Sequence, residues 1–470
     1  MANELVLKPE LNTPYLLNDN KERQVKVKLT IHPSDEIRMK KDNVPTELGT
    51  DVCLVLDVSG SMRDIIAGEV VSTGQTVMIE GQLRNIVTGG TSKLDCAISA
   101  VQKLLPKLRD NDTLSLVAYE DNSHIIFKGY KKNQQKEMLQ KLEECRRYSG
   151  NTNISGALRE ARVLLKDIPG SRPKKIIFLT DGNPVGDTEE AGIHEGEMLA
   201  EYNITIDCLG IGDDFNLAFI NRIAAPSKGR TNLIETPEDA ERIFTELFEK
   251  SQDVLATNLE LHLRFSPQVR VTEHYRGVPE NMYLGKVRMP QDDRTVTLKL
   301  GQVETHQRYE YFFLITVPPQ EGYNGMFRLM QAEATYYLPG ITSDKEITKK
   351  SIAVEFGDKS QFAQRRNGEV ESGYSQAEIM RLLTEAEDAL KKSKNGEAGQ
   401  KYQLIIDKYM SLGMVEEAKL YREMLSKFQK TGQITLSDLN KAHSTSSKAA
   451  DSGEISPLLD EEDEDFIFGR

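Results

Sequence analysis

The feature that most constrains the fold is a region, from about residue 50 to residue 250, in which two kinds of segment alternate. Short, nearly all-apolar segments are predicted to be strands: Val52–Leu56, Thr113–Tyr119, Lys175–Thr180 and Ile204–Leu209. Between and after them lie amphipathic segments with helical spacing: Leu94–Leu105, Lys136–Arg146, Ile154–Lys166, Glu189–Glu201 and Ala240–Lys250. Strands that are apolar on both faces must be covered on both faces. The alternation therefore predicts an α/β fold with a doubly wound, mostly parallel sheet.

The segments that directly flank this region are predicted to contain strands and no helices. From about Asn258 to Phe356, strand candidates are separated by turns rich in Pro and Gly, which predicts an antiparallel β-sandwich. Two more strand candidates, Glu4–Leu7 and Gln24–Ile31, precede the α/β region. Two strands alone do not make a stable unit. We therefore expect them to complete the sandwich, with the α/β domain inserted into it.

The last part of the chain is predicted to be helical and then disordered. Ser375 and Glu378 fit a capping box, and breaks near Asn395–Gly396 and Gly413 divide the region up to Thr431 into three short helices. The sequence after about Leu436 is polar and then acidic. The expected organisation is N-terminal strands in residues 1–45, the α/β domain in 46–252, the sandwich in 253–358, a C-terminal helical module in 372–432 and a disordered acidic tail in 433–470.

Composition excludes some function classes. The net charge of −13 argues against a general nucleic-acid binder, which needs a basic face. We expect no membrane partner, because no stretch has the length and apolarity of a membrane span. The N-terminus lacks the pattern of a signal peptide, and Cys53 and Cys208 lie in apolar strand-like runs. These features predict a cytoplasmic protein with buried, reduced thiols.

The residues that carry chemistry follow the first strand of the α/β region. Asp57, Ser59 and Ser61 form the run Asp-Val-Ser-Gly-Ser at its end, where their oxygens can point at one centre. In an open parallel sheet, ligands bind beyond the carboxyl ends of the strands. Short oxygen side chains without thiolate or imidazole select a hard cation, Mg²⁺ or Mn²⁺.

Two further residues fit the same site. Thr152 precedes a predicted helix, and Asp181 directly follows the strand Lys175–Thr180. Taken alone, the serine-containing run could be a turn, Thr152 a helix cap and Asp181 a turn residue before Gly182. Their order along the chain, each at a strand or helix end, favours one shared metal site.

With these residues the sequence resembles the von Willebrand factor A (vWA) family, in the form found in bacterial cytosolic proteins with a flanking β-sandwich. The resemblance covers about residues 50 to 250 and extends to Ile211-Gly212-Asp213-Asp214. It implies a metal-ion-dependent adhesion site (MIDAS). The family's five ligand positions correspond to Asp57, Ser59, Ser61, Thr152 and Asp181.

The resemblance implies a protein–protein interaction module rather than an enzyme. In such a site the metal keeps a coordination position for an Asp or Glu of the partner. The expected role is a scaffold or adaptor in a cytosolic complex. MoxR-type AAA+ ATPases and kinase or phosphatase signalling proteins are partners of some vWA proteins, but no residue of this chain selects one of them.

The alternative function is a Mg²⁺-dependent phosphoester hydrolase that uses the same metal site. Several enzyme patterns are absent: a second Asp two residues after Asp57, where Ser59 stands, a phosphate-binding GxxxxGK[ST] loop and a GxSxG nucleophile motif. Ser59 and Ser61 also have no neighbouring His in the motif that could activate them. The sequence therefore favours the binding module.

One feature departs from the family pattern, and a second lies at the C-terminus, outside the region of resemblance. Arg63 to Ser92 separates the Asp57 loop from the first helix, and Gln75–Ile79 with Leu83–Val87 reads as a β-hairpin that could shape the ligand-binding face. At the C-terminus, the acidic run from Asp460 to Asp465 precedes Phe466–Phe468, which could be a docking motif or a solvated tail.

Overall fold

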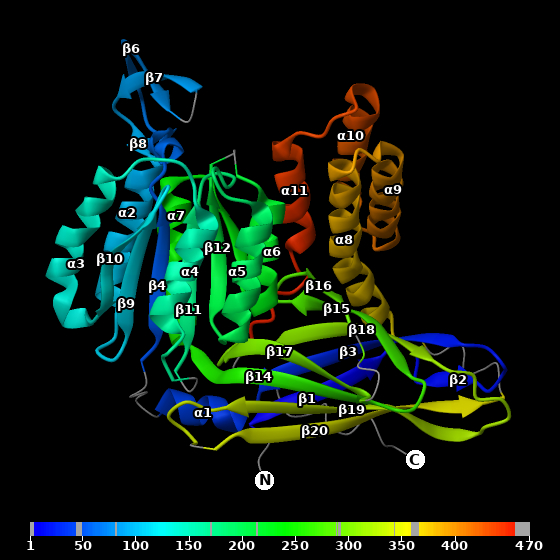
Figure 1. Cartoon of the computed structure of the whole chain (residues 1–470). Helices are drawn as coiled ribbons and strands as arrows, with labels where there is room; N and C mark the ends of the chain where they lie inside the picture. The colour runs from blue at the N-terminus through cyan, green and yellow to red at the C-terminus, as the bar shows by residue number, and fades with distance from the viewer. Residues whose placement is uncertain are drawn as a thin grey trace.

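The computed structural model describes three packed units (Figure 1). The described residues are 4–43, 49–79, 82–169, 172–212, 215–287, 289, 293–342, 344–358 and 366–455. The predicted disordered tail from 456 onward, with its acidic and aromatic residues, and Asp213 and Asp214 lie outside them.

The α/β domain has a six-stranded sheet with the order β10-β9-β4-β11-β12-β13. Its strands, in chain order, are β4 (Asp51–Asp57), β9 (Thr113–Tyr119), β10 (Ser123–Tyr130), β11 (Lys174–Thr180), β12 (Thr205–Ile211) and β13 (Thr231–Ile234). All pairs are parallel except β9 with β10. The four predicted strands are confirmed as the four central ones. The two edge strands, β10 and β13, were not predicted.

Helices cover both faces of this sheet, as the apolar strands require. The helices of the domain are α2 (Lys93–Leu104), α3 (Gln135–Leu142), α4 (Ile154–Leu165), α5 (Glu189–Glu201), α6 (Leu217–Ala224) and α7 (Pro237–Gln252). α2, α3 and α7 contribute to one apolar core, and α4, α5 and α6 to the other. The doubly wound fold class is therefore confirmed. Four free cysteines are buried, and they include Cys53 and Cys208.

Two five-stranded sheets form the sandwich. One has the order β1-β3-β18-β15-β16, and the other β17-β14-β19-β20-β2. Their strands are β1 (Leu5–Leu11), β2 (Tyr15–Leu17), β3 (Arg23–Pro33), β14 (Val254–Phe265), β15 (Arg270–Val278), β16 (Met282–Lys286), β17 (Thr295–Glu304), β18 (Tyr309–Val317), β19 (Gly325–Tyr337) and β20 (Glu346–Gly357). β3 pairs with β18 along nine residues, so the chain enters the sandwich before the α/β domain and returns to it afterwards. The short helix α1 (Asp35–Asn43) follows β3.

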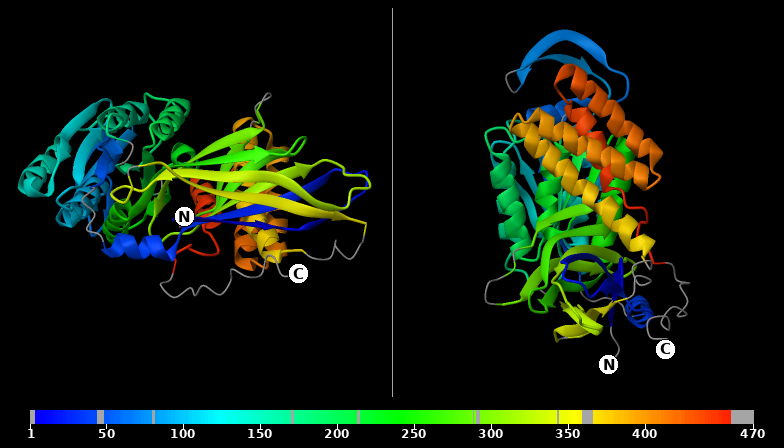
Figure 2. Two further views of the ribbon diagram at one scale, coloured as in Figure 1. Left: turned by 90° about the horizontal axis from the view of Figure 1, so that it is seen from below. Right: turned by 90° about the vertical axis from the view of Figure 1, so that its right-hand side faces the viewer.

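The C-terminal module stands on the sandwich beside the α/β domain (Figure 2). Its helices are α8 (Gly368–Lys391), α9 (Asn395–Ser411), α10 (Val415–Thr431) and α11 (Leu436–Ser447). α8 begins earlier than predicted, with the Asn367 side chain accepting hydrogen bonds from two amides of its first turn. Ser375 therefore lies inside α8, and the predicted capping box there is wrong.

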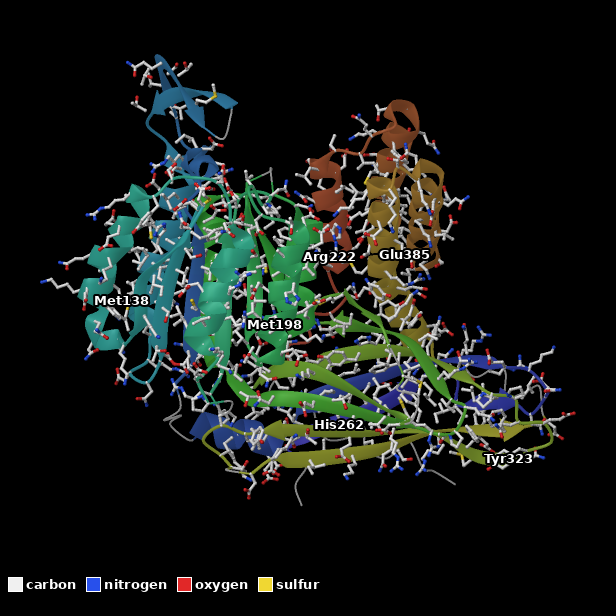
Figure 3. All side chains as sticks on the ribbon, viewed as in Figure 1. Met138, Met198, Arg222, His262, Tyr323 and Glu385 are labelled. Atoms are coloured by element: carbon white, nitrogen blue, oxygen red, sulfur yellow. The ribbon has the colours of Figure 1, made fainter. Side chains whose placement is uncertain are left out.

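The prediction of a disordered chain from residue 433 is wrong for residues 436–455. The side chain of Asn440, on α11, bridges to α6: its Oδ1 accepts from the amide of Leu217 at 3.1 Å, and its Nδ2 donates to the carbonyl of Phe215 at 2.9 Å. Beyond α11, the amide of Arg308 donates to the carbonyl of Gly453 at 2.7 Å. The polar composition that suggested disorder supplies these contacts. Figure 3 shows Arg222 of α6 and Glu385 of α8 on the two sides of this junction.

None of the described helices combines the length and apolarity that a bilayer-spanning helix needs.

Candidate metal centre

The carboxyl edge of the central strands brings four of the five predicted site residues into one hydrogen-bonded group. β4 ends in Asp57, and the neighbouring parallel strand β11 is followed directly by Asp181. The Ser61 hydroxyl donates to Asp181 Oδ1 at 2.8 Å, and the hydroxyl oxygens of Ser59 and Ser61 lie 3.2 Å apart. The Ser59 amide donates to Asp57 Oδ1 at 2.9 Å, which folds the loop back on the strand end.

The fifth predicted residue, Thr152, is placed beside this group by its backbone. Its amide and carbonyl pair with Val185, in the loop that follows Asp181. Two residues before Thr152, the carbonyl of Gly150 accepts a hydrogen bond from the amide of Gly60 at 3.0 Å. The three loops therefore meet at one rim, and Thr152 is almost fully buried there.

Three residues that the sequence analysis did not assign to the site complete its inner layer. Tyr119 and Thr180 donate their hydroxyl protons to Asp57 Oδ2, at 3.1 and 3.0 Å. Lys93 places its Nζ 2.9 Å from Asp181 Oδ2. Tyr119 and Thr180 are the last residues of predicted strands of the same sheet as Asp57, so their positions could have indicated them. A lysine at the start of a helix gives no comparable signal.

The charges of this hydrogen-bonded group are unfavourably placed, because like charges lie together in a buried environment. Asp57 and Asp181 are both fully buried. Burial, together with the charge of Asp181, raises the pKa of Asp57 to about 7. Burial and the nearby Asp57 also raise the pKa of Tyr119 well above its usual value, so the phenol keeps its proton as a donor. Two carboxylates in one buried group are stabilised by a nearby cation.

The donor set fits a hard divalent cation. It offers carboxylate and hydroxyl oxygens and no thiolate or imidazole, the choice of ligand that favours Mg²⁺ or Mn²⁺. Within the described ranges, no group of three or more His, Cys, Asp or Glu side chains is placed to hold a metal ion. The candidate site therefore depends on Ser59, Ser61 and Thr152 as well as on its two carboxylates.

The inserted segment forms a hairpin above this rim (Figure 1). β6 (Val71–Ile79) pairs with β7 (Gln82–Thr88), which confirms the predicted hairpin with somewhat longer strands. Below them β5 (Ile65–Ala67) pairs with β8 (Thr91–Ser92). Val71 and Met78 of β6 are apolar side chains that expose 67% and 62% of their surface.

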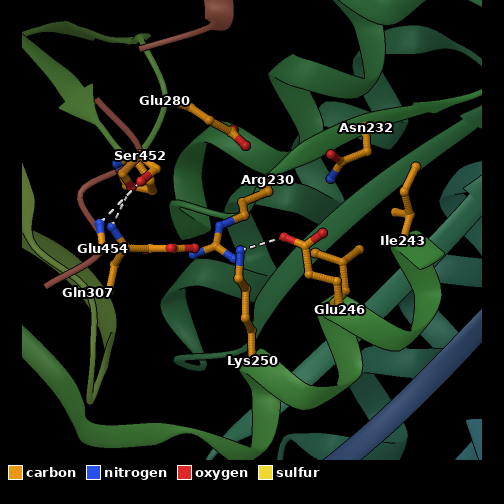
Figure 4. Close-up of a pocket in the computed structure, with 11 residues that line it drawn as sticks. Arg230, Asn232, Ile243, Glu246, Lys250, Glu280, Gln307, Ser452 and Glu454 are labelled. Carbon is orange, nitrogen blue, oxygen red and sulfur yellow. Dashed lines mark hydrogen bonds and ion pairs between the residues drawn. The ribbon is translucent and has the colours of Figure 1, made fainter. Parts of the chain in front are cut away.

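The opposite edge of the sheet carries a second group of buried charges, at the contact with the sandwich. Arg230 lies with its Nη2 2.6 Å from Glu304 Oε2, and Lys175 with its Nζ 2.6 Å from Asp207 Oδ2. Although burial opposes its charge, Glu304 raises the pKa of Arg230. Figure 4 shows Arg230 in the cavity of about 180 Å³ beside these pairs, where Gln307 donates to the carbonyl of Ser452 at 2.8 Å.

Known proteins share parts of this sequence and the whole of this fold. Residues 52–183 match the family model described as the von Willebrand factor type A domain. An uncharacterized protein of Synechocystis sp. is 27% identical over 239 residues, which cover 50% of this chain and 49% of that protein. Inter-alpha-trypsin inhibitor heavy chain H2 of Mus musculus is 24% identical over 257 residues, or 50% of this chain and 24% of its own length. The matches thus span about half of the first relative and a quarter of the second.

Two solved structures have the same architecture along nearly the whole chain. The von Willebrand factor type A protein from Catenulispora acidiphila aligns with a TM-score of 0.72 and 18% identity, covering 95% of this chain and 97% of that one. The ArnB paralog VWA2 from Sulfolobus acidocaldarius aligns with a TM-score of 0.58 and 16% identity, covering 94% and 98%. The combination of α/β domain, sandwich and helices is therefore a recurrent fold.

Proposed function

Residues 52–183 belong to the von Willebrand factor type A family, and on that premise we propose that this protein is a metal-dependent interaction module. Asp57, Ser59, Ser61, Thr152 and Asp181 would hold Mg²⁺ or Mn²⁺, and an Asp or Glu of a partner protein would complete the coordination of the ion. The protein would act as a scaffold or adaptor. A MoxR-type AAA+ ATPase and kinase or phosphatase signalling proteins are the partner classes that follow from the resemblance.

The observation that carries the proposal is the hydrogen-bonded group at the rim. Its two buried carboxylates, Asp57 and Asp181, face the hydroxyls of Ser59 and Ser61, and Lys93 is the cation in contact with Asp181. A bound divalent ion would supply an electrophilic centre for an oxygen ligand. The residues themselves hold the loops in place: Tyr119 and Thr180 fix the carboxylate of Asp57 from below.

The hairpin next to the site supports a protein, rather than a small acidic ion, as the ligand that would complete the coordination of the metal. Val71 and Met78 offer exposed apolar surface. Metal coordination by one carboxylate selects acidic ligands in general, whereas apolar contacts around it select among them. We assign this selection among acidic ligands to the hairpin.

Calorimetric titration of Mn²⁺ and Mg²⁺ into the metal-free protein tests the metal site. We expect saturable binding by the wild type and by Asp167→Ala, an exposed carboxylate after α4 that serves as the control, and no binding by Asp57→Ala. Equal binding by Asp57→Ala and the wild type would refute the site. A folded wild type that binds neither ion would refute the metal-dependent function.

Affinity capture tests the second half of the proposal. A partner retained by the wild type in Mg²⁺ should be lost in EDTA and by Asp57→Ala, and should be displaced when its own acidic residue is changed to the amide. Retention in EDTA would place the interface elsewhere. Turnover of p-nitrophenyl phosphate that disappears in Asp57→Ala would favour the phosphoester hydrolase instead.

A further inference from the structure

Lys93 stands where physical chemistry disfavours a lysine. It is the first residue of α2, and its side chain exposes only 7% of its surface. Lysine is rarely buried without a partner, because its ammonium group loses hydration. The positive end of the helix dipole adds to this cost at the first turn of a helix. A residue that breaks two local rules needs a compensating interaction.

The compensation comes from the candidate metal centre. Lys93 Nζ contacts Asp181 Oδ2 at 2.9 Å, while Oδ1 of the same carboxylate accepts from Ser61. Lys93 thus shares its carboxylate with the group that would hold the ion. It approaches from α2, on a different side of Asp181 from the serine loop.

The neighbouring strand end is shaped to admit this side chain. Gly212 follows β12 with a φ of +82°, and a Cβ atom there would lie 2.8 Å from Lys93 Cε. Any larger residue would therefore press on the lysine stem. The glycine also permits the left-handed backbone that the turn adopts.

The charges of the group show what Lys93 does. With both carboxylates ionised, two carboxylates and one ammonium group leave one negative charge, whereas the carboxylates alone would leave two. A divalent ion entering the site would meet the positive charge of Lys93 at close range, in surroundings that screen it weakly. The same positive charge stabilises Asp181 while no ion is bound.

We propose that Lys93 is a tethered cation that stands in for part of the metal's charge in the metal-free site and lowers the affinity of the site for divalent ions. The loops are then pre-assembled before an ion arrives, and only a sufficient metal concentration fills the site. This inference rests on the proposed function, because it concerns the same metal.

Mn²⁺ calorimetry on the full chain tests the inference, with Lys93→Met compared with the wild type. Lys103→Met is the matched control, because Lys103 lies on the same helix and exposes 58% of its side chain. We expect Lys93→Met to bind Mn²⁺ at least tenfold more tightly, about 1.4 kcal/mol, and Lys103→Met to bind like the wild type. Without metal, Lys93→Met should melt at a lower temperature than the wild type and should gain more from added Mn²⁺.

The outcomes distinguish the proposed metal site from the proposed role of Lys93. Unchanged or weaker Mn²⁺ binding by folded Lys93→Met, with binding by the wild type intact, overturns the role of Lys93 alone. Absence of binding in both proteins overturns the metal site and the inference together. Binding by Lys93→Met alone supports the role of Lys93, but it overturns a metal-dependent function of the wild type. If Lys93→Met does not fold, Lys93→Gln, whose amide can still donate to Asp181, takes its place with the same expectations.

Discussion

The two edges of the α/β sheet hold buried charges in opposite states of balance. At the edge that meets the sandwich, Arg230 lies against Glu304 and Lys175 against Asp207, so each of these two cations has a carboxylate of its own. At the other edge, within the part of the chain that the structure describes, Lys93 is the one cation that forms an ion pair with either of the two carboxylates, and it pairs with Asp181. The same strands support both groups, since β11 begins beside one and ends beside the other.

The difference distinguishes a structural group of buried charges from a functional one. Paired buried charges hold two units in a fixed orientation, and removal of one partner leaves the other uncompensated. A buried group with unbalanced charge destabilises the fold, and such a group is retained where a bound ligand compensates for its charge. The junction with the sandwich is therefore expected to be structural, and the edge with Asp57 to be the functional one. The following predictions test this contrast.

The largest effect is expected at the junction. Glu304→Ala leaves Arg230 buried without its carboxylate, so the free energy of unfolding should fall by about 3–5 kcal/mol. Urea unfolding measures this loss. Glu201→Ala, which removes an exposed pair with Lys299, should cost less than about 1 kcal/mol. Similar losses in the two variants would contradict the structural role of the junction.

The next effect is a loss of stability in acid that depends on His274. Burial, with the charge of Lys228 beside the junction, lowers the pKa of His274 to about 4 from 6.5. Between these values the unfolded chain binds a proton that the folded protein does not. Stability should therefore fall as the pH drops from about 6.5 to about 4, by about 3 kcal/mol in total. Urea unfolding across this range should show a flatter profile for His274→Asn; an unchanged profile would exclude His274 as the cause.

A smaller effect of opposite sign is expected at the site. In EDTA, Asp57→Asn removes one of two like charges and should raise the free energy of unfolding by about 1 kcal/mol. Asp207→Asn makes the same chemical change at the junction, where it should lower stability because Lys175 loses its partner. Urea unfolding of both variants gives the comparison directly. Destabilisation by both changes would mean that the two edges do not differ.

The smallest effect on stability is expected from the hairpin. Deletion of residues 69–89 joins Gly68 to Gly90, which lie side by side, and leaves a two-residue turn between the paired strands β5 and β8. It should change the free energy of unfolding by less than about 0.5 kcal/mol. Partner affinity in Mg²⁺ should fall while Mn²⁺ affinity stays the same. Unchanged partner binding by the folded deletion variant would exclude the hairpin from recognition.

The sequence predicted the central sheet correctly, and it offered the five residues of the proposed site, because both depend on local patterns. Buried parallel strands are apolar along their length, and the residues after them meet at one edge. The edge strand β13 has only four residues, and β10 pairs with β9 through irregular register, so neither gives a clear pattern. Strands at the edge of a sheet are less constrained by burial.

Other features depend on contacts between distant residues. α11 reads as a polar tail, yet Asn440 and His443 are buried against α6 and α8. Lys93 is 88 residues away from the carboxylate that it contacts, so no motif joins them. The helix propensity of a segment does not indicate such contacts with residues that are distant in the sequence.

Diffraction from crystals soaked in Mn²⁺, recorded at a wavelength where manganese scatters anomalously, tests the central claim most directly. The account predicts one strong peak at the rim, in contact with the hydroxyl oxygens of Ser59 and Ser61 and absent from crystals of Asp57→Ala. A Mn²⁺ peak elsewhere, or ordered loops without a peak at a saturating concentration, would contradict the assignment of this edge as a metal centre.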